Sequence, residues 1–270
     1  MSFIYFFVII ALNINSDANS YLDYQSAYLN GIHYQTVLGS NGSERPFAFL
    51  SLAFANEQDE IEPVRAEIDW DRPVVALTFD DGPSYYTKAI LDILEYHGVV
   101  ATFCVVGRLV YDNRDIVYRA YTFGHEIIGH SYNHPNFAII NNDEIARQIL
   151  DTSAAIRQAT GSDVPKIMRP PYGIVTDRVL QVAKEHGYAL VNWSIDPRDW
   201  YFTCPDYIYA VIRHNIQHGS IILLHDTMPT TVAAVELFLP RLIDDGYQFV
   251  TLSELLLHIH GEIVPGNLYR

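Results

Sequence analysis

Short apolar runs alternate with amphipathic segments along the chain from residue 73 to residue 260. The runs are rich in β-branched residues, which is typical of buried strands, whereas the segments between them carry apolar residues at helical spacing. Strands are expected at residues 74–79, 101–106, 126–129, 166–169, 188–194, 220–224 and 247–252. Helices are expected at residues 88–97, 115–123, 143–160, 177–186, 207–218, 231–242 and 253–260, several of them stopped by a glycine.

Strict alternation of strands and helices predicts an α/β fold with a parallel sheet and helices packed outside it. Connections of this length favour closure of the sheet, so the pattern predicts a barrel of seven β/α units over residues 73–262. An open doubly wound sheet is the alternative fold, but no G-x-G-x-x-G follows any expected strand. Residues 263–270 are expected to form a tail.

Residues 1–72 lack a sustained period and are expected to form a leader with a linker or a small accessory layer. The apolar segment 3–12 is short for a bilayer span and of the right length for the core of a signal peptide. No basic residue precedes it, so a membrane anchor or a strand is the alternative. A second candidate signal, residues 47–54, leads into the pattern Ala53-Phe54-Ala55. We therefore expect export to the cell surface or the extracellular space.

The overall charge of the chain restricts its partners. The 270 residues carry a formal net charge of −15 at pH 7. Nucleic-acid binding depends on Lys and Arg residues that neutralise phosphates, so a nucleic-acid partner is excluded. The two cysteines lie far apart in no metal-ligand spacing, and Cys104 sits within an apolar run. Cys104 is therefore expected to be a buried, unreactive thiol rather than the disulfide partner of Cys204.

Titratable side chains follow five of the expected strands. In a barrel of parallel strands, the loops after the strands meet at one face, where barrel enzymes build their sites. We therefore expect these side chains to converge. They are Asp80, Asp81, His130, His134, Arg169, Asp196, Arg198, Asp199, His225 and Asp226.

His130 and His134 form a metal-ligand pattern together with the acidic pair Asp80-Asp81. Two neutral imidazoles and one carboxylate are a common open zinc set, which leaves a coordination position for water and substrate. One carboxylate of the pair is expected to bind the metal and the other to act as a base, because adjacent side chains point in different directions. A phosphotransferase aspartate loop is the alternative, but it needs its two acids separated by one residue.

The chain contains, in order, the segments TFDDGP, HSYNH, RPPYG, DPRDW and LLHD. This series resembles the five motifs of the polysaccharide deacetylases of carbohydrate esterase family four, the NodB-homology domain, and covers roughly residues 73–261. The resemblance implies a distorted (β/α)7 barrel and a metal-dependent hydrolase that removes N-acetyl groups from N-acetylglucosamine units of peptidoglycan or a chitin-like polymer. Removal of acetyl esters from xylan, or glycan binding without catalysis, are the alternatives. No pattern in the chain specifies an oligomeric state.

The resemblance implies a role for each residue of the metal half of the site. Asp81, His130 and His134 would bind a divalent metal, with Zn²⁺ expected and Co²⁺ or another divalent ion as the alternative. Asp80 would be the general base that takes a proton from the attacking water. Arg169 would hold Asp80 ionised, since an adjacent positive charge favours the carboxylate.

The resemblance also implies an acid and a substrate pocket. His225 would protonate the leaving nitrogen, and Asp199 would orient His225 and favour its protonated form. The backbone N–H of Tyr172 would help to hold the oxyanion. Trp200 and Leu223 are expected to shape the acetyl pocket, although such apolar residues are more often core.

Three other residues are expected to take no direct part in the reaction. Cys104 stands where relatives often carry an aromatic residue, and we expect it to lie away from the motifs and to affect packing alone. Asp226 is expected to support the site or to cap a helix rather than to react. Ser84 is expected to satisfy the loop backbone.

Overall fold

The computed structural model describes residues 32–38, 44–50 and 67–270. The chain divides into two compact units, residues 1–61 and residues 62–270. In the first unit, β1 (Ile32–Leu38) and β2 (Glu44–Leu50) form an antiparallel pair that the sequence pattern did not predict. The candidate signal at residues 47–54 begins inside β2, and the apolar segment 3–12 lies outside the described residues.

The second unit alternates strands and helices, as expected. Its strands are β3 (Val74–Asp80), β4 (Thr102–Val105), β5 (Glu126–Gly129), β6 (Ile167–Met168), β7 (Ala189–Val191), β8 (Ile221–His225), β9 (Gln248–Val250) and β10 (Leu268–Tyr269). Its helices are α2 (Tyr85–Tyr96), α3 (Gly107–Val110), α4 (Arg114–Thr122), α5 (Asn142–Thr160), α6 (Asp177–Glu185), α7 (Pro205–Asn215), α8 (Pro229–Asp244) and α9 (Leu252–His260), with 3₁₀ turns at Tyr111–Asn113 and Pro171–Gly173. None of the helices among the described residues combines the length and the apolar character needed to cross a membrane.

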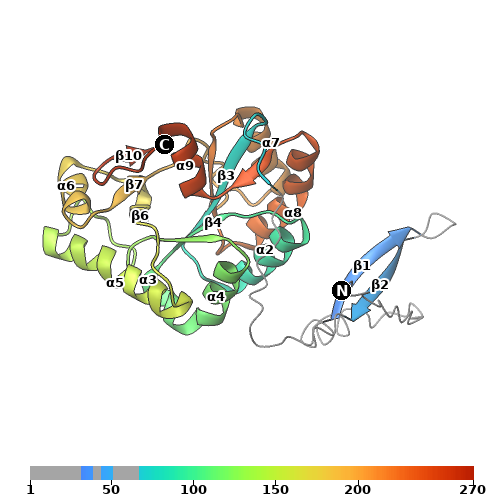
Figure 1. Ribbon diagram of the computed structural model, residues 1–270, viewed down its shortest axis with the longest axis horizontal. Coiled ribbons are helices and arrows are strands. Elements are labelled where there is room, and N and C mark those ends of the chain that lie inside the picture. Colours follow the sequence, from blue (N-terminus) through green and yellow to red (C-terminus); the bar gives the residue numbers. More distant parts are fainter. Residues whose placement is uncertain (1–31, 39–43, 51–66) are drawn as a thin grey trace, which may run out of the picture. The chain divides into compact units, whose positions relative to one another are not determined.

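The strands of the second unit form one parallel sheet in the order β10, β7, β6, β5, β4, β3, β8, with β9 also paired to β3. Figure 1 shows helices α2, α4, α5, α6 and α8 around this sheet. The sheet curls back on itself. This is seen in a parallel bridge between Ile195, in the segment that follows β7, and Ile222 of β8. The α/β class and the distorted barrel are therefore confirmed, and the ring closes between β7 and β8 through that bridge.

Strands β9 and β10 depart from a regular seven-unit barrel. β9 pairs with Val74–Ala76 at the start of β3, while β8 pairs directly with Ala76–Asp80 of the same strand. β9 therefore does not lie between β3 and β8. β10 pairs with β7, where Leu268 lies opposite Leu190. Residues 263–270, expected as a tail, thus contain a strand of the sheet. The division into leader, catalytic domain and tail stays a prediction.

Local sequence signals explain where several elements begin and end. Ser84 caps α2: its hydroxyl accepts from the backbone N–H of Tyr86, and its own backbone N–H donates to the Thr87 hydroxyl at 2.7 Å. This cap starts the helix directly after the Asp80-Asp81 loop, earlier than expected. β6 is shorter than expected, because Pro170 and Pro171 follow it and have no N–H to donate.

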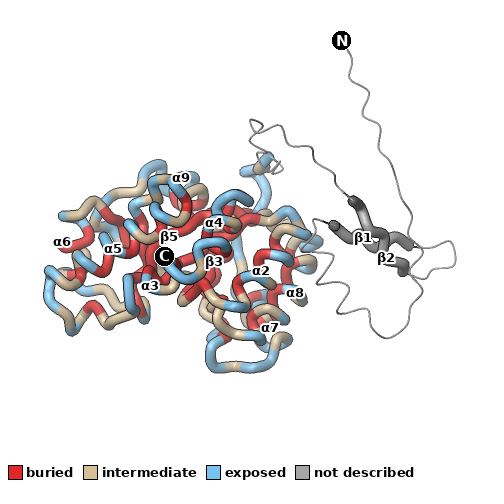
Figure 2. Tube along the Cα trace, turned by 90° about the horizontal axis from the view of Figure 1, so that it is seen from below, coloured by how far each residue is buried: buried red, intermediate tan, exposed pale blue. Residues whose placement is uncertain are grey.

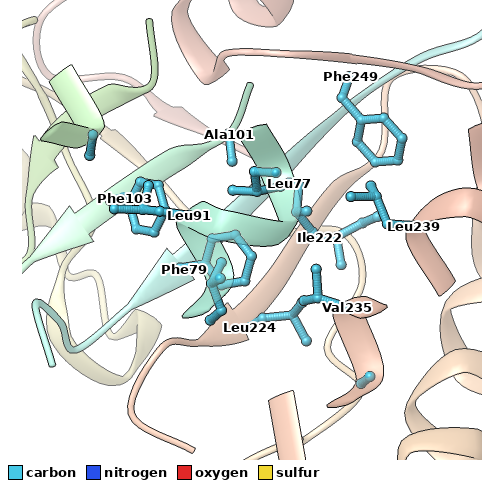
Figure 3. Close-up of a cluster of buried hydrophobic side chains, with 14 of the residues drawn as sticks. Leu77, Phe79, Leu91, Ala101, Phe103, Ile222, Leu224, Val235, Leu239 and Phe249 are labelled. Atoms are coloured by element: carbon cyan, nitrogen blue, oxygen red, sulfur yellow. The ribbon is translucent and has the colours of Figure 1, made fainter. Parts of the chain in front are cut away.

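The core has one layer on each face of the curled sheet. Val75, Leu77 and Phe79 of β3 pack outward against α2 and α8 in the cluster of Figure 3, where the rings of Phe79 and Phe103 stack at 5.2 Å. Val74 and Ala76, which alternate with them, face the interior together with Cys104, Ile128 and residues of α9. Figure 2 shows the result: buried strands inside and exposed helix faces outside. Burial of both faces holds the strand ends in fixed positions.

Candidate active site

The predicted site residues meet at the edge of the sheet where the parallel strands end. Asp80 is the last residue of β3 and His225 the last of β8, and the two lie opposite each other in the strand register. His130 follows β5 directly, and Arg169 follows β6 directly. Asp199 lies in the loop after β7 and contacts His225. The parallel topology therefore brings together residues that are far apart in the sequence.

Asp81, His130 and His134 bring three ligand atoms within 4.8 Å of one another. The Nε2 atoms of His130 and His134 lie 3.4 Å and 3.2 Å from Oδ1 of Asp81. This Oδ1 atom is buried and has no hydrogen-bond partner among the described residues. A buried carboxylate oxygen that faces two imidazole nitrogens without a donor fits a cation held between them.

The backbone is strained at the rim of the sheet, the edge formed by the ends of the parallel strands and the segments that follow them. Among the described residues, five other than glycine lie in the left-handed region, with φ between 54° and 76°, and every one is in a segment that follows a strand. A left-handed non-glycine residue costs about 1–3 kcal/mol and persists only where the surrounding structure enforces it. These residues are Asp81, Ser131, His134, Tyr172 and Arg198. Two of them, Asp81 and His134, belong to the candidate ligand set.

The ring of His130 is oriented by its second nitrogen. Nδ1 lies 2.8 Å from the carbonyl oxygen of Arg169, to which it donates, so Nε2 faces Asp81. Metal-binding histidines use this arrangement to fix the tautomer. Burial opposes the charge of His130, but Asp80 and Asp81 outweigh burial and raise its pKa. Burial likewise opposes ionisation of Asp81, and the two imidazoles hold the Asp81 pKa below its ordinary value. A cation would compete with a proton for these atoms.

Asp80 is buried against Arg169. Its Oδ1 accepts a hydrogen bond from Nη1 of Arg169 at 2.7 Å, and its Oδ2 lies 3.7 Å from Nε2 of His130. The fully buried guanidinium also donates to the hydroxyl of Thr78 at 2.7 Å and to the carbonyl oxygen of Asn192 at 3.1 Å. Burial opposes the charge of Arg169, but Asp80 outweighs burial and raises the pKa of the guanidinium. The carboxylate of Asp80 is thus paired with a permanent positive charge and held in one orientation.

His225 and Asp199 form the second charged pair of the rim. Nδ1 of His225 lies 2.8 Å from Oδ1 of Asp199, and the His225 backbone N–H donates to Oδ2 at 2.7 Å. The hydroxyl of Thr231, in the first turn of α8, donates to the same Oδ2 at 2.5 Å. Burial alone would lower the pKa of His225, but Asp199, with Asp80 and Asp81 beyond it, raises that pKa to about 9. His225 therefore carries its proton at neutral pH.

The three residues predicted to meet the substrate differ in exposure. Leu223 of β8 is 3% exposed, whereas Trp200 is 54% and Tyr172 61% exposed. The ring of Tyr172 packs edge-on against His134, with centroids 4.6 Å apart, so Tyr172 lies beside the candidate ligand set. Trp200 follows Asp199 directly in the chain. The contacts of these residues with a substrate stay predictions.

Cys104 lies within the site, and the expectation that it lies away from the motifs is wrong. Cys104 is opposite Asp80 in the register of β3 and β4. Burial and the Asp80 carboxylate raise the pKa of its thiol, against the opposing charge of Arg169. Cys104 is buried and Cys204 exposed, and both are free, which confirms that they form no disulfide.

Sequence reasoning missed Thr78, which holds the Arg169 guanidinium. Its hydroxyl accepts from Arg169 and donates to the carbonyl oxygen of Ile222 at 2.7 Å. The signal was available, because Thr78 precedes Asp80 by two positions and so shares its face of the strand. Thr231 and Asn192 carried no such signal: one lies at the start of a helix, and the other contributes a backbone carbonyl.

Comparison with known proteins gives matches over the same region. The family model for polysaccharide deacetylase matches residues 68–191. The peptidoglycan-N-acetylglucosamine deacetylase PgdA of Listeria monocytogenes is 40% identical over 182 residues, which cover 67% of this chain and 38% of that protein. A peptidoglycan-N-acetylglucosamine deacetylase of Bacillus cereus is 34% identical over 249 residues, which cover 86% of each chain. This chain therefore spans well under half of the Listeria protein and most of the Bacillus protein.

A solved structure gives the same result for the fold. The family 4 acetyl xylan esterase from Clostridium thermocellum, in complex with a cobalt ion, is 35% identical with a TM-score of 0.68, and the match covers 73% of this chain and 97% of that one. At this identity, the likeness extends beyond the fold. Together with the ordered motifs and their convergence on one rim, these matches show that the chain belongs to the polysaccharide deacetylase family.

Proposed function

We propose that the protein is a metal-dependent hydrolase that removes N-acetyl groups from N-acetylglucosamine units of a polysaccharide such as peptidoglycan or chitin. The proposal depends above all on one observation: the three ligand atoms of Asp81, His130 and His134 gather beside the buried Asp80–Arg169 pair. Its relatives named as peptidoglycan-N-acetylglucosamine deacetylases support the same substrate class.

The donor set fits a divalent metal. Asp81, His130 and His134 would hold it through one oxygen and two nitrogens, a combination that Zn²⁺ accepts and that leaves room for further ligands. Co²⁺ is the alternative, since the related acetyl xylan esterase structure contains a cobalt ion. When bound, the metal would polarise the acetyl carbonyl and make water more acidic.

Asp80 is proposed to be the general base. Its carboxylate is 2% exposed, and one of its oxygens is occupied by Arg169, which leaves the other on the side of His130. It would accept a proton from the attacking water as the water adds to the acetyl carbon. Arg169 would keep the carboxylate in the charged form that can accept this proton.

His225 is proposed to be the general acid. Its raised pKa of about 9 keeps the ring protonated, and Asp199 fixes the ring through Nδ1. The proton on the other nitrogen would pass to the leaving nitrogen of the sugar, because an amine leaves poorly as an anion. In this scheme, Asp80 and His225 differ in role because the neighbour of Asp80 is a cation and that of His225 is an anion.

The acetyl group is proposed to lie against Trp200 and Leu223, with the backbone N–H of Tyr172 directed at the oxyanion. Tyr172 adopts a left-handed conformation at φ 61°, directly after Pro171. This turn would set the direction of its N–H, while its ring lies against His134. The enzyme is further proposed to act outside the cytoplasm, where its polymeric substrate is found.

Hydrolysis of acetyl esters on xylan is the second candidate, favoured by the 35% identity to an acetyl xylan esterase. The two activities share the attack step and differ in the leaving group. An alkoxide leaves more readily than an unprotonated nitrogen anion, so the ester reaction depends less on the proton of His225. The ratio of kcat/KM for the two substrates in the parent would distinguish the native substrate class from a side activity. In a His225→Gln variant, the amide activity should fall more than the ester activity.

The direct test measures acetate release by the full chain from N-acetylglucosamine oligomers and from acetylated xylan. We expect release from the amide substrate, loss of release after exhaustive chelation, and recovery on addition of Zn²⁺ or Co²⁺. Acetate release that survives chelation in metal-free buffer would overturn the metal-dependent mechanism. Oligomer binding without release under all metal conditions would instead show a glycan-binding protein that has lost catalysis.

A further inference from the structure

Asp226 is a buried carboxyl group that the proposed mechanism does not use. It follows His225 at the end of β8 and is 1% exposed. Its backbone N–H donates to the carbonyl oxygen of Asp80 at 3.3 Å. The residue thus joins the strand that carries the proposed acid to the strand that carries the proposed base.

The side chain of Asp226 contacts the loop that follows Asp81. Its Oδ2 accepts from the hydroxyl of Thr87 at 2.6 Å, and its backbone carbonyl accepts from the hydroxyl of Ser84. Ser84 is the N-cap of α2, and Thr87 completes the capping box. Asp226 therefore holds the first turn of α2 from outside that helix, and the helix fixes the far end of the loop.

The same carboxylate explains the glycine at position 82. A Cβ atom on Gly82 would lie 2.0 Å from Oδ2 and 2.4 Å from Oδ1 of Asp226, so the carboxylate occupies the space of a side chain. Gly82 is absent from the residues with positive φ, so it does not lie in the left-handed region that favours glycine. Space, rather than conformation, requires glycine here. Asp226 thus packs directly on the residue after Asp81.

The Asp226 carboxyl is held in this position at a cost in stability. Oδ1 of Asp226 is buried and has no hydrogen-bond partner among the described residues. Burial raises the pKa of Asp226 to about 7, with Asp81 and Asp80 adding to the rise and Thr87 opposing it. A buried carboxyl with one unpaired oxygen costs stability, a cost that its contacts with Thr87 and Gly82 would have to offset.

We propose that Asp226 is a positioning residue, which fixes the loop from Asp81 to Ser84 so that the Asp81 carboxylate meets the imidazoles of His130 and His134. The inference rests on the proposed function only in that these three residues hold a metal. It assigns Asp226 no contact with substrate. Asp226 acts through the position of Asp81, by filling the space over Gly82 and by anchoring Thr87.

The test compares the Zn²⁺ affinity of metal-free parent protein with that of Asp226→Ala and Asp226→Asn, by competition with a chromophoric chelator. Removing a residue that orients a metal ligand typically weakens metal affinity about 10–100-fold, and we expect a loss of this size for Asp226→Ala. Asp226→Asn keeps the shape and an acceptor for Thr87, so its affinity should stay close to that of the parent. Circular dichroism would establish that each metal-free variant is folded.

Glu126→Ala is the matched control. Glu126 is also a buried carboxyl that accepts from a threonine hydroxyl, at 2.9 Å, and from a backbone N–H at the start of a helix, at 3.1 Å. It lies at the start of β5, at the opposite end of that strand from His130. Glu126→Ala should lower thermal stability and leave Zn²⁺ affinity unchanged.

A double mutant tests the contact itself. Gly82→Ala places a methyl group on the Asp226 carboxylate and should weaken Zn²⁺ binding in the parent. In the Asp226→Ala background, the space is free, and the same change should weaken binding less. Equal effects in both backgrounds would contradict the packing of Asp226 on Gly82.

Three outcomes would overturn the inference. The first is parental Zn²⁺ affinity in folded Asp226→Ala. The second is an affinity loss in Asp226→Asn as large as that in Asp226→Ala, since charge rather than position would then be the cause. A Glu126→Ala variant with equally weakened binding would make the effect one of general stability. If the parent protein binds no Zn²⁺, the proposed function is contradicted. If the parent and Asp226→Ala bind Zn²⁺ equally well, this inference alone is contradicted.

Discussion

The two ends of the parallel sheet bury the same kinds of group under different conditions. Where the strands end, Asp80 pairs with Arg169, and His225 pairs with Asp199. Where β5 begins, the donors to the buried Glu126 within the described part of the chain are neutral, the hydroxyl of Thr102 and the backbone N–H of Ser253. Burial raises the pKa of Glu126 in spite of these donors. The two pairs at the ends of the strands therefore keep their charge, whereas Glu126 favours the neutral acid.

The two ends of the sheet also differ in which residues adopt the left-handed backbone conformation. Left-handed positions that close helices and lead into the starts of strands are glycines, such as Gly161 after α5 and Gly187 after α6. At the rim, Asp81 and His134 adopt this conformation and keep their side chains. Strain is accepted where a side chain is needed for chemistry and avoided where the chain only turns. Buried charge and backbone strain together distinguish a site from a structural cluster of the same composition.

The largest effects are expected from two variants that separate loss of the Asp80 charge from loss of metal binding at the rim. Asp80→Asn keeps the size of the side chain and should leave Zn²⁺ bound, while turnover falls about 10²–10⁴-fold through loss of the base. His134→Ala should lose both metal and turnover. Elemental analysis of purified variants, together with acetate release, would measure the two properties. Equal metal loss in both variants would reverse the roles assigned to Asp80 and His134.

The charge of His225 gives the next prediction. Its pKa of about 9 lies above the ordinary value of 6.5, so the protonated acid persists as the pH rises and is lost through about pH 9. The alkaline limb of kcat should therefore lie near pH 9. Asp199→Asn removes the main carboxylate partner and should move that limb to lower pH by about one to three pH units. A limb that stays in place in the Asp199→Asn variant would show that another group controls it.

A smaller effect is expected from a left-handed glycine away from the rim. Gly161→Ala adds a Cβ that meets no atom within 4 Å, so its cost is conformational alone. Urea denaturation should show a loss of about 1 kcal/mol in the free energy of unfolding. The kcat value should not change, and a large loss of turnover would show that strain at this end of the sheet also affects the site.

The smallest effect is expected for Glu126→Gln. Because the folded-state pKa of Glu126 lies above its ordinary value of 4.5, its ionisation weakens the fold as the pH rises from about 4.5 towards the folded pKa. Glutamine keeps an acceptor and has no charge to bury. The variant should gain stability relative to the parent from acid to neutral pH, by about 1 kcal/mol at most, with unchanged acetate release. Thermal unfolding at several pH values would measure this difference.

The alternation of apolar runs with helical segments predicted a parallel sheet. It also predicted that the site lies at the carboxyl ends of the strands, because the period of each strand and its direction in the chain are local properties. The motif residues after the strands were predicted for the same reason. Thr78 was within reach of the same argument, since it shares a strand face with Asp80. The pairing of β9 with the start of β3 could not be predicted, because strand order depends on contacts between distant segments.

Two features of the site could not be deduced from residue types. The left-handed conformation of Ser131 and Tyr172 is imposed by tertiary contacts on residues that do not favour it. The position of Cys104 beside Asp80 follows from the register of β3 and β4, and a shift of one residue would turn its side chain to the other face. Register is set by the whole sheet, so a prediction from sequence spacing placed Cys104 too far away.

The short strand β10 sets a practical limit on how the protein can be altered. Backbone N–H groups of Leu190 and Asn192 donate to the carbonyl oxygens of Asn267 and Tyr269, at 2.8 Å and 2.9 Å. Deleting residues 267–270 would leave a bare edge on β7, and bare edges recruit strands from neighbouring molecules. Versions truncated in this way are therefore expected to self-associate.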